Sequence, residues 1–112
     1  MKVMISQPMA GKTDAQIIEV RRKAVAYLES LGHEVENTLF DCFSDNLLLE
    51  NGFKQIPLFY LAHSLESMSR CDAVYFCNGW QHARGCKIEH EAAEKYGLVL
   101  MYENGDAYET HR

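Results

Sequence analysis

The sequence has few of the features that mark membrane, secreted or nucleic-acid-binding proteins. None of its apolar runs approaches the roughly 20 residues that a membrane-spanning helix needs. The chain turns polar after five residues, so it lacks the apolar core of a signal peptide. Acidic residues outnumber basic ones by 16 to 11, and the net charge of −5 argues against non-specific binding to nucleic acid. We therefore expect a cytoplasmic protein that binds neither membranes nor nucleic acid, while a small anionic ligand in one local pocket stays compatible with this charge.

The cysteines form no Cys-x-x-Cys pair, the spacing that is typical of redox motifs and zinc sites. Cys71 and Cys77 bracket an apolar run, where cysteine usually acts as a small hydrophobic residue. We interpret all four cysteines, Cys42 and Cys86 included, as reduced thiols.

The length of 112 residues suits one domain with its own core. A hydrophobic fraction of 47% and a charged fraction of 24% are ordinary for a globular protein. Because no stretch is repeated and no linker divides the chain, we predict a single domain over residues 1–103 and a polar tail over 104–112.

Apolar runs that read as strands alternate with amphipathic stretches that read as helices. The predicted strands cover residues 2–6, 34–40, 72–77 and 98–102. The predicted helices run from the capping box at 13–16 to the turn at Gly32, from Pro57 to about Arg70, and over 86–97, while 41–56 is mostly loop with one helical turn near 46–50. The second predicted helix places Leu58, Leu61, Leu65 and Met68 on one side.

This alternation predicts an α/β fold in which a four- or five-stranded parallel sheet is covered on both faces, with a flavodoxin/Rossmann-like strand order. In such three-layer domains, ligands bind at the carboxyl ends of the strands, beside helix N-termini. The two loops at that end are residues 6–13 and 78–86. We expect the functional site there.

The first of these loops contains Gly11, Lys12 and Thr13, which resemble the end of a phosphate-binding P-loop. The first glycine of that motif would fall on Ser6, and Pro8 lacks the backbone N–H that the wrap around a phosphate uses. Two interpretations remain open. The loop is either a plain strand-to-helix turn or an anion site at the helix N-terminus, with Gly11 permitting close approach and Lys12 adding charge.

The helix over 86–97 carries one glutamate on its predicted inward face. With successive residues turning by about 100°, Glu89 lies about 60° from Ala92, which we take as the centre of the apolar stripe. Ile88 and Tyr96 flank that centre at about 40° on either side. His90, Glu91 and Glu94 are predicted to point to solvent.

A carboxylate on an inward face is costly unless it is paired or has a function. Glu89 could accept hydrogen bonds from the helix start or pair with a cation such as Arg84. Alternatively, an ionised carboxylate beside a pocket can attack a sugar carbon and form a covalent glycosyl-enzyme intermediate, as retaining glycosidases do.

Two segments, "KVMISQPMAGKT" and "SLESMSRCDAVYFCNGWQHARGCKIEHEAAEKYGLVLMYE", resemble the nucleoside 2-deoxyribosyltransferase-like superfamily, and within it a small branch of unknown function. The resemblance implies that Glu89, four residues after Gly85, is the nucleophile that attacks the anomeric carbon of a 2-deoxynucleoside or its 5′-monophosphate. It also implies a homo-oligomer and a ligand site lined by the first turn, through Ser6, Gln7, Met9, Gly11 and Lys12.

One position departs from the pattern of the active relatives. They carry an aspartate eight residues before the one that opens the third strand, and the corresponding residue here is Ser64, counted back from Asp72. A hydroxyl can hydrogen-bond to a sugar oxygen, but it supplies no charge and cannot act as a general acid. Ser64 therefore counts as a substrate-binding candidate.

Three further features near the second loop have alternative roles. Trp80 either walls the pocket and stacks on a base or plugs the end of the sheet. His82, Cys86 and His90 recur every four residues, but the helix is expected to start at Gly85, after His82, so that we predict no metal site. Asp72 is interpreted as a structural hydrogen-bond acceptor.

Taken together, these features predict cleavage or transfer of the N-glycosidic bond of a (deoxy)nucleoside or nucleoside 5′-monophosphate, through a covalent intermediate on Glu89 and without a cofactor. The alternative is a non-catalytic module that binds a nucleotide or an ADP-ribose-like ligand in the same cleft.

Overall fold

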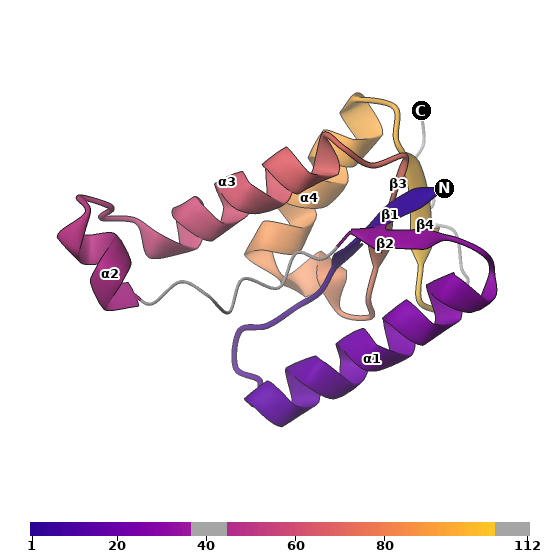
Figure 1. The fold of residues 1–112 in the computed structure, drawn as a ribbon, viewed down its shortest axis with the longest axis horizontal. Coiled ribbons are helices and arrows are strands. Elements are labelled where there is room, and N and C mark those ends of the chain that lie inside the picture. Colours follow the sequence, from indigo (N-terminus) through magenta and orange to yellow (C-terminus); the bar gives the residue numbers. More distant parts are fainter. Residues whose placement is uncertain (37–44, 105–112) are drawn as a thin grey trace.

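The computed structural model describes residues 1–36 and 45–104. Its elements, in chain order, are β1 (Lys2–Ser6), α1 (Asp14–Ser30), β2 (Glu34–Glu36), α2 (Asp45–Glu50), α3 (Ile56–Met68), β3 (Ala73–Phe76), the 3-10 helix η1 (Trp80–His82), α4 (Arg84–Lys95) and β4 (Val99–Tyr102). All strand pairs are parallel, and the strand order is β2-β1-β3-β4 (Figure 1).

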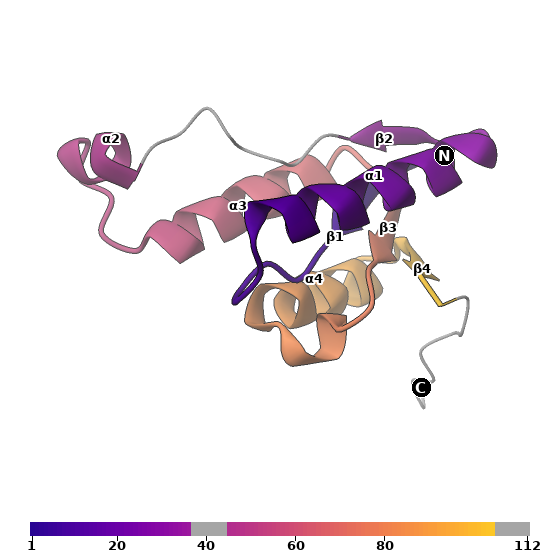
Figure 2. The same cartoon turned by 90° about the horizontal axis from the view of Figure 1, so that it is seen from below.

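Helices cover both faces of the sheet, with α1 on one face and α3 and α4 on the other (Figures 1 and 2). Each face has its own apolar core. Ile5 and Tyr75 pack with Leu28 of α1, whereas Met4 and Phe76 face the α3–α4 side. Successive strand residues point to opposite faces, which explains the split between neighbours such as Met4 and Ile5. The predicted three-layer α/β fold is confirmed.

The signals at the ends of α1 act as predicted. Thr13 Oγ1 accepts a hydrogen bond from Gln16 N, and Gln16 Oε1 accepts one from Thr13 N, which completes a capping box. At the other end, Gly32 adopts φ +85°, a left-handed conformation that residues with a Cβ rarely take. The chain then enters β2.

Some predicted boundaries differ from the structure. The second strand is described over Glu34–Glu36, and residues 37–40 of its predicted range lie outside the described residues. The last helix starts at Arg84, two residues earlier than predicted, because Ala83 already adopts the extended backbone of an N-cap. This shift moves Glu89 from the first turn of α4 into the second.

The predicted apolar side of α3 is only partly buried. Met68 is 5% exposed, but Leu58, near the other end of this side, is 59% exposed. The reason is that α3 begins well away from the sheet, near α2, and reaches the core only with its later turns (Figure 1).

Asp72 and the cysteines have the structural roles that were predicted. Asp72 Oδ2 accepts a hydrogen bond of 2.9 Å from the backbone N–H of Lys2, at the start of the β1–β3 pair. Cys71, Cys77 and Cys86 are free thiols, and Cys42 lies outside the described residues. Within residues 1–36 and 45–104, no helix combines the length and the apolar character that crossing a membrane requires.

Candidate functional site

The two predicted loops lie side by side at the carboxyl ends of β1 and β3. Cys77 N donates a hydrogen bond of 2.9 Å to Ser6 O, which continues the strand pairing to the loop entrance. A Cβ added at Gly79 would lie 3.7 Å from Cγ of Pro8, so the loops are in contact. The connection that follows β1 covers one face of the sheet, and the connection that follows β3 covers the other. The carboxyl ends of β1 and β3 therefore form the topological switch point, where ligands of α/β sheets bind.

Glu89 lies on the α3–α4 face of this point and is 8% exposed. Ser6 Oγ, at the end of β1, donates a hydrogen bond of 2.6 Å to Glu89 Oε1. The hydroxyl of Ser64, on α3, lies near the Glu89 carboxylate and favours its ionised form. The inward orientation predicted from helix geometry is therefore correct, and side chains from β1, α3 and α4 meet at one carboxylate.

Burial raises the pKa of the Glu89 carboxyl group above its ordinary value, and the hydrogen bonds from Ser6 and Ser64 oppose this rise only in part. Across the described part of the chain, no lysine or arginine forms an ion pair with Glu89, and this includes Arg84. A buried carboxyl group without a cation, hydrogen-bonded by one serine hydroxyl and near another, is unusual as a purely structural element. It is suited to exchanging a proton or attacking an electrophile.

Cys86 belongs to the same cluster and was not predicted as a site residue. Its thiol is 4% exposed and interacts with the hydroxyl of Ser6. Burial raises the pKa of this thiol to about 11, so it stays protonated at neutral pH and is a poor nucleophile. Cys86 lies one turn before Glu89 on the same face of α4, and this spacing in the sequence could have identified it as a site residue.

The predicted apolar stripe of α4 is not the buried one. Ile88 is 41% exposed and Tyr96 is 85% exposed, whereas His90, predicted to face solvent, is 4% exposed. Glu91 is exposed as predicted, but Glu94 is half-buried rather than solvent-facing. The inward face is centred on Ala93 and carries Cys86, Glu89 and His90.

His90 is buried because aromatic side chains enclose it. Its ring stacks on that of Trp80, with centroids 4.1 Å apart and planes at 11°. Its Nε2 forms a hydrogen bond of 2.7 Å with the Tyr102 hydroxyl, and burial lowers the pKa of the imidazole. Trp80 is itself 6% exposed and also packs on Phe76. This geometry favours the plug at the sheet end over the base-stacking role.

The first loop presents a mixture of exposed and buried candidates. Met9 is 43% exposed and starts a turn in which Lys12 N donates to Met9 O. Gly11 occupies the third position of this turn with φ +76°, and Lys12 is exposed. Gln7 is 7% exposed, and its Nε2 donates a hydrogen bond of 2.6 Å to Ile17 O, which ties the loop to α1.

The two helix N-termini at this end differ in their availability to a ligand. The capping box of Thr13 and Gln16 engages two backbone donors at the start of α1, which weakens the case for an anion site there. The N-cap of α4, Ala83, makes no side-chain cap hydrogen bond. The first-turn amides of α4, Gly85 included, are therefore the better partners for an anionic group.

The predicted site residues thus fall into three groups. Ser6 is hydrogen-bonded to Glu89 and Ser64 lies near the same carboxylate, while Gly85 lies half-buried at the start of α4, the helix that carries Glu89. Met9, Gly11 and Lys12 lie on an exposed turn, while Gln7 and Trp80 are buried. Across residues 1–36 and 45–104, no group of three His, Cys, Asp or Glu side chains is arranged to hold a metal ion.

Comparisons with known proteins identify the family and nothing more specific. No curated protein and no solved structure matches the chain significantly. The model of a family described as a domain of unknown function, DUF4406, matches residues 1–102. This range includes every element of the sheet and every candidate residue named above. The chain therefore belongs to the DUF4406 family.

Proposed function

We propose that this protein cleaves or transfers the N-glycosidic bond of a (deoxy)nucleoside or nucleoside 5′-monophosphate, with Glu89 as the nucleophile. The observation that carries the proposal is the environment of the Glu89 carboxyl group. Its carboxyl group is buried at the switch point of the sheet, accepts a hydrogen bond from the Ser6 hydroxyl, and lies near the hydroxyl of Ser64. The resemblance to the nucleoside 2-deoxyribosyltransferase-like superfamily points to the same residue independently.

The proposed reaction has two steps. The ionised carboxylate of Glu89 attacks C1′, the C1′–N bond breaks, and the base leaves with the bonding electrons and takes up a proton from solvent. Water or the ring nitrogen of a second base then attacks C1′ of the glycosyl ester. That step releases the Glu89 carboxylate and gives hydrolysis or transfer, respectively.

Ser6 and Ser64 act on the nucleophile in this proposal. The Ser6 hydroxyl donates a hydrogen bond to the carboxylate, which favours the ionised form and restricts its rotation, and the Ser64 hydroxyl also favours the ionised form. The uncapped N-terminus of α4 at Gly85 suits a 5′-phosphate, and Lys12 on the neighbouring turn adds positive charge at the same end of the sheet. No cofactor is required, and we propose a cytoplasmic homo-oligomer.

The direct test is incubation with the four 2′-deoxynucleosides and their 5′-monophosphates, followed by chromatography for free base. The wild-type protein should release base from at least one of them. Glu89→Ala should abolish release, and Glu89→Gln should do so while keeping the shape of the side chain. Release that survives both substitutions would remove Glu89 from its proposed role.

A non-catalytic nucleotide-binding module is the second candidate, and Ser64 favours it. At the position where active relatives have an aspartate, the chain has the hydroxyl of Ser64, which lies near the Glu89 carboxylate. This candidate predicts that the wild-type protein binds nucleotide, by calorimetry, without releasing base. In that case, Ser64→Asp should introduce base release. The enzymatic proposal instead predicts that the wild-type protein already releases base.

A further inference from the structure

His90 is a buried imidazole at the centre of the aromatic cluster on α4. It is 4% exposed, and its ring stacks on the indole of Trp80 with centroids 4.1 Å apart. The centroid of the Phe76 ring lies 4.8 Å away, and the Tyr102 hydroxyl shares a hydrogen bond of 2.7 Å with Nε2. Side chains from η1, β3 and β4 therefore enclose the imidazole.

The groups that face His90 differ in charge. The Glu94 carboxylate, one turn further along α4, favours the protonated ring. The thiol of Cys86, one turn earlier, is neutral at physiological pH because burial raises its pKa to about 11. The Glu89 carboxyl group is directed to β1, and β4 contributes the phenol of Tyr102.

Burial outweighs the effect of Glu94 on this imidazole. It lowers the pKa of His90 below the ordinary value of 6.5, because the charged ring loses its hydration when it is enclosed. The arrangement in the structure, which we call the closed state, therefore holds the neutral ring better than the charged one.

One part of this enclosure can move more easily than the rest. We define the Trp80 segment as residues 79–83, which include η1. Ala83 N donates a hydrogen bond to Trp80 O, and His82 N donates one to Gly79 O, so these bonds stay within the segment. The strands β3 and β4 are paired in the sheet, whereas the buried indole of Trp80 anchors the segment to the α3–α4 core. Release of this indole therefore frees the segment at low cost.

The Trp80 segment is part of the second loop of the candidate site. A Cβ added at Gly79 would lie 3.7 Å from Cγ of Pro8, so the segment lies against the first loop. Its last residue, Ala83, is the N-cap of α4. Opening of the segment therefore separates the two loops at the carboxyl ends of β1 and β3.

We propose that His90 positions the Trp80 segment only while its imidazole is neutral, and that mild acid opens the segment reversibly without unfolding the sheet. Opening exposes His90, which then takes up a proton that the closed state resists. The open state has the ordinary pKa near 6.5 and the closed state a lower one. Between these two values, each unit decrease in pH favours the open state by a further factor of up to ten.

The fluorescence of Trp80 tests this proposal, because it is the only tryptophan in the chain. Its indole is 6% exposed in the closed state, so opening should shift the emission to longer wavelength. The shift should appear between pH 8 and pH 5 and reverse when the pH is raised, while far-UV circular dichroism stays constant. No nucleotide is present, so the result is independent of the proposed function.

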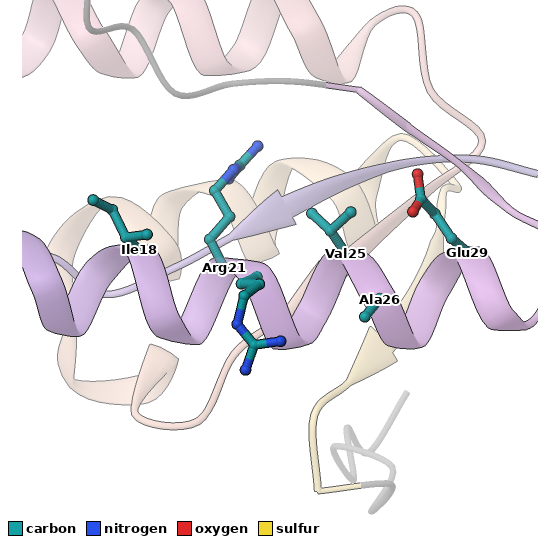
Figure 3. Close-up of a pocket in the computed structure, with 6 residues that line it drawn as sticks. Ile18, Arg21, Val25, Ala26 and Glu29 are labelled. Atoms are coloured by element: carbon teal, nitrogen blue, oxygen red, sulfur yellow. The ribbon is translucent and has the colours of Figure 1, made fainter.

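Four variants assign the transition to one residue. His90→Phe keeps a ring against Trp80 but cannot take up a proton, so its emission should not depend on pH. His82→Gln is the matched control, because His82 lies in the same segment but is exposed, and it should keep the transition. Glu89→Gln should also keep it, which separates it from titration of Glu89. Ile18→Ser is the remote control, since Ile18 lines a shallow pocket on α1, the helix on the opposite face of the sheet (Figure 3).

Amide hydrogen exchange measures the same opening in the wild-type protein. The protection factor of Ala83, whose N–H is bonded to Trp80 O, should fall about fivefold between pH 6.5 and pH 5.5, as expected when one proton is taken up on opening. Protection in β1 should not change over this range.

Four results would overturn the inference. The first is wild-type emission that is quenched in acid without a shift in wavelength, because the charged ring then stays stacked on Trp80. The second is a shift that persists in folded His90→Phe, and the third is a shift that is lost in His82→Gln. The fourth is loss of circular dichroism together with the shift, which means that the whole domain unfolds.

Discussion

Ser6 Oγ lies 2.6 Å from Glu89 Oε1 and donates a hydrogen bond to it, which joins the end of β1 to α4 across 83 positions of the chain. The contact exists because β1 ends where α4 passes over the sheet. This hydrogen bond gives the buried carboxyl group a polar partner and fixes its orientation. Its consequences can be measured in several ways.

Ser6→Ala should reduce glycosidic activity and shift its pH dependence. The hydroxyl favours ionised Glu89, so its removal raises the pKa of the carboxyl group further. The acid limb of the kcat profile should move to higher pH, and kcat at pH 6 should fall about tenfold, as expected for losing one hydrogen bond to a charged group. Ser67→Ala, a buried serine on α3, is the control and should leave the profile unchanged.

Glu89→Gln should make the folded protein more stable at alkaline pH. The folded-state pKa of Glu89 is raised, so the folded state binds more protons than the unfolded state above the ordinary carboxyl pKa near 4.5. Wild-type stability therefore falls as pH rises from 4.5 through the folded-state pKa, and glutamine removes this loss. Urea unfolding at pH 4 and pH 8 should show the gain only at pH 8. Equal differences at both values would contradict the raised pKa.

Gly11→Ala should destabilise the protein by about 1 kcal/mol, because φ +76° is unfavourable for a residue with a Cβ. No atom lies within 4 Å of the added Cβ, so strain is the only cost. Gly85→Ala is the matched comparison, since that Cβ is also unobstructed but the residue is helical, and about 0.5–1 kcal/mol of stabilisation is expected. Urea titration of both variants checks the opposite signs.

Trp80→Ala should cost about 3–5 kcal/mol, because the indole fills the space between Phe76 and His90. Trp80→Phe should cost much less and leave nucleotide affinity unchanged if the residue is a plug. The measurements are urea unfolding and calorimetric binding. A tenfold loss of affinity in folded Trp80→Phe would instead restore the base-stacking role.

Local signals in the sequence were sufficient to predict the fold. The capping box at Thr13 and the left-handed glycine at 32 mark the ends of α1, and the apolar run at 72–77 marks a central parallel strand. These features act over a few residues, so neighbouring positions determine them. Boundaries shifted by up to two residues where no side chain caps the helix, as at Arg84.

The site could be predicted only in part, because it depends on contacts between distant segments. Helix geometry correctly turned Glu89 inward, even though the assumed centre of the buried face was wrong. Nothing local in the sequence shows that Trp80 stacks on His90 and thereby buries an imidazole. The contact of Ser64 with Glu89 likewise depends on how α3 packs beside α4.

The most direct measurement is mass spectrometry of the intact protein, quenched in acid during incubation with a 2′-deoxynucleoside 5′-monophosphate that it cleaves. A covalent intermediate should increase the protein mass by one deoxyribosyl phosphate, and peptide mapping should place the added group on Glu89. The Glu89→Gln variant should show no added mass. A glycosyl group on another residue, or base release without any adduct under conditions that trap such esters, would contradict Glu89 as the nucleophile.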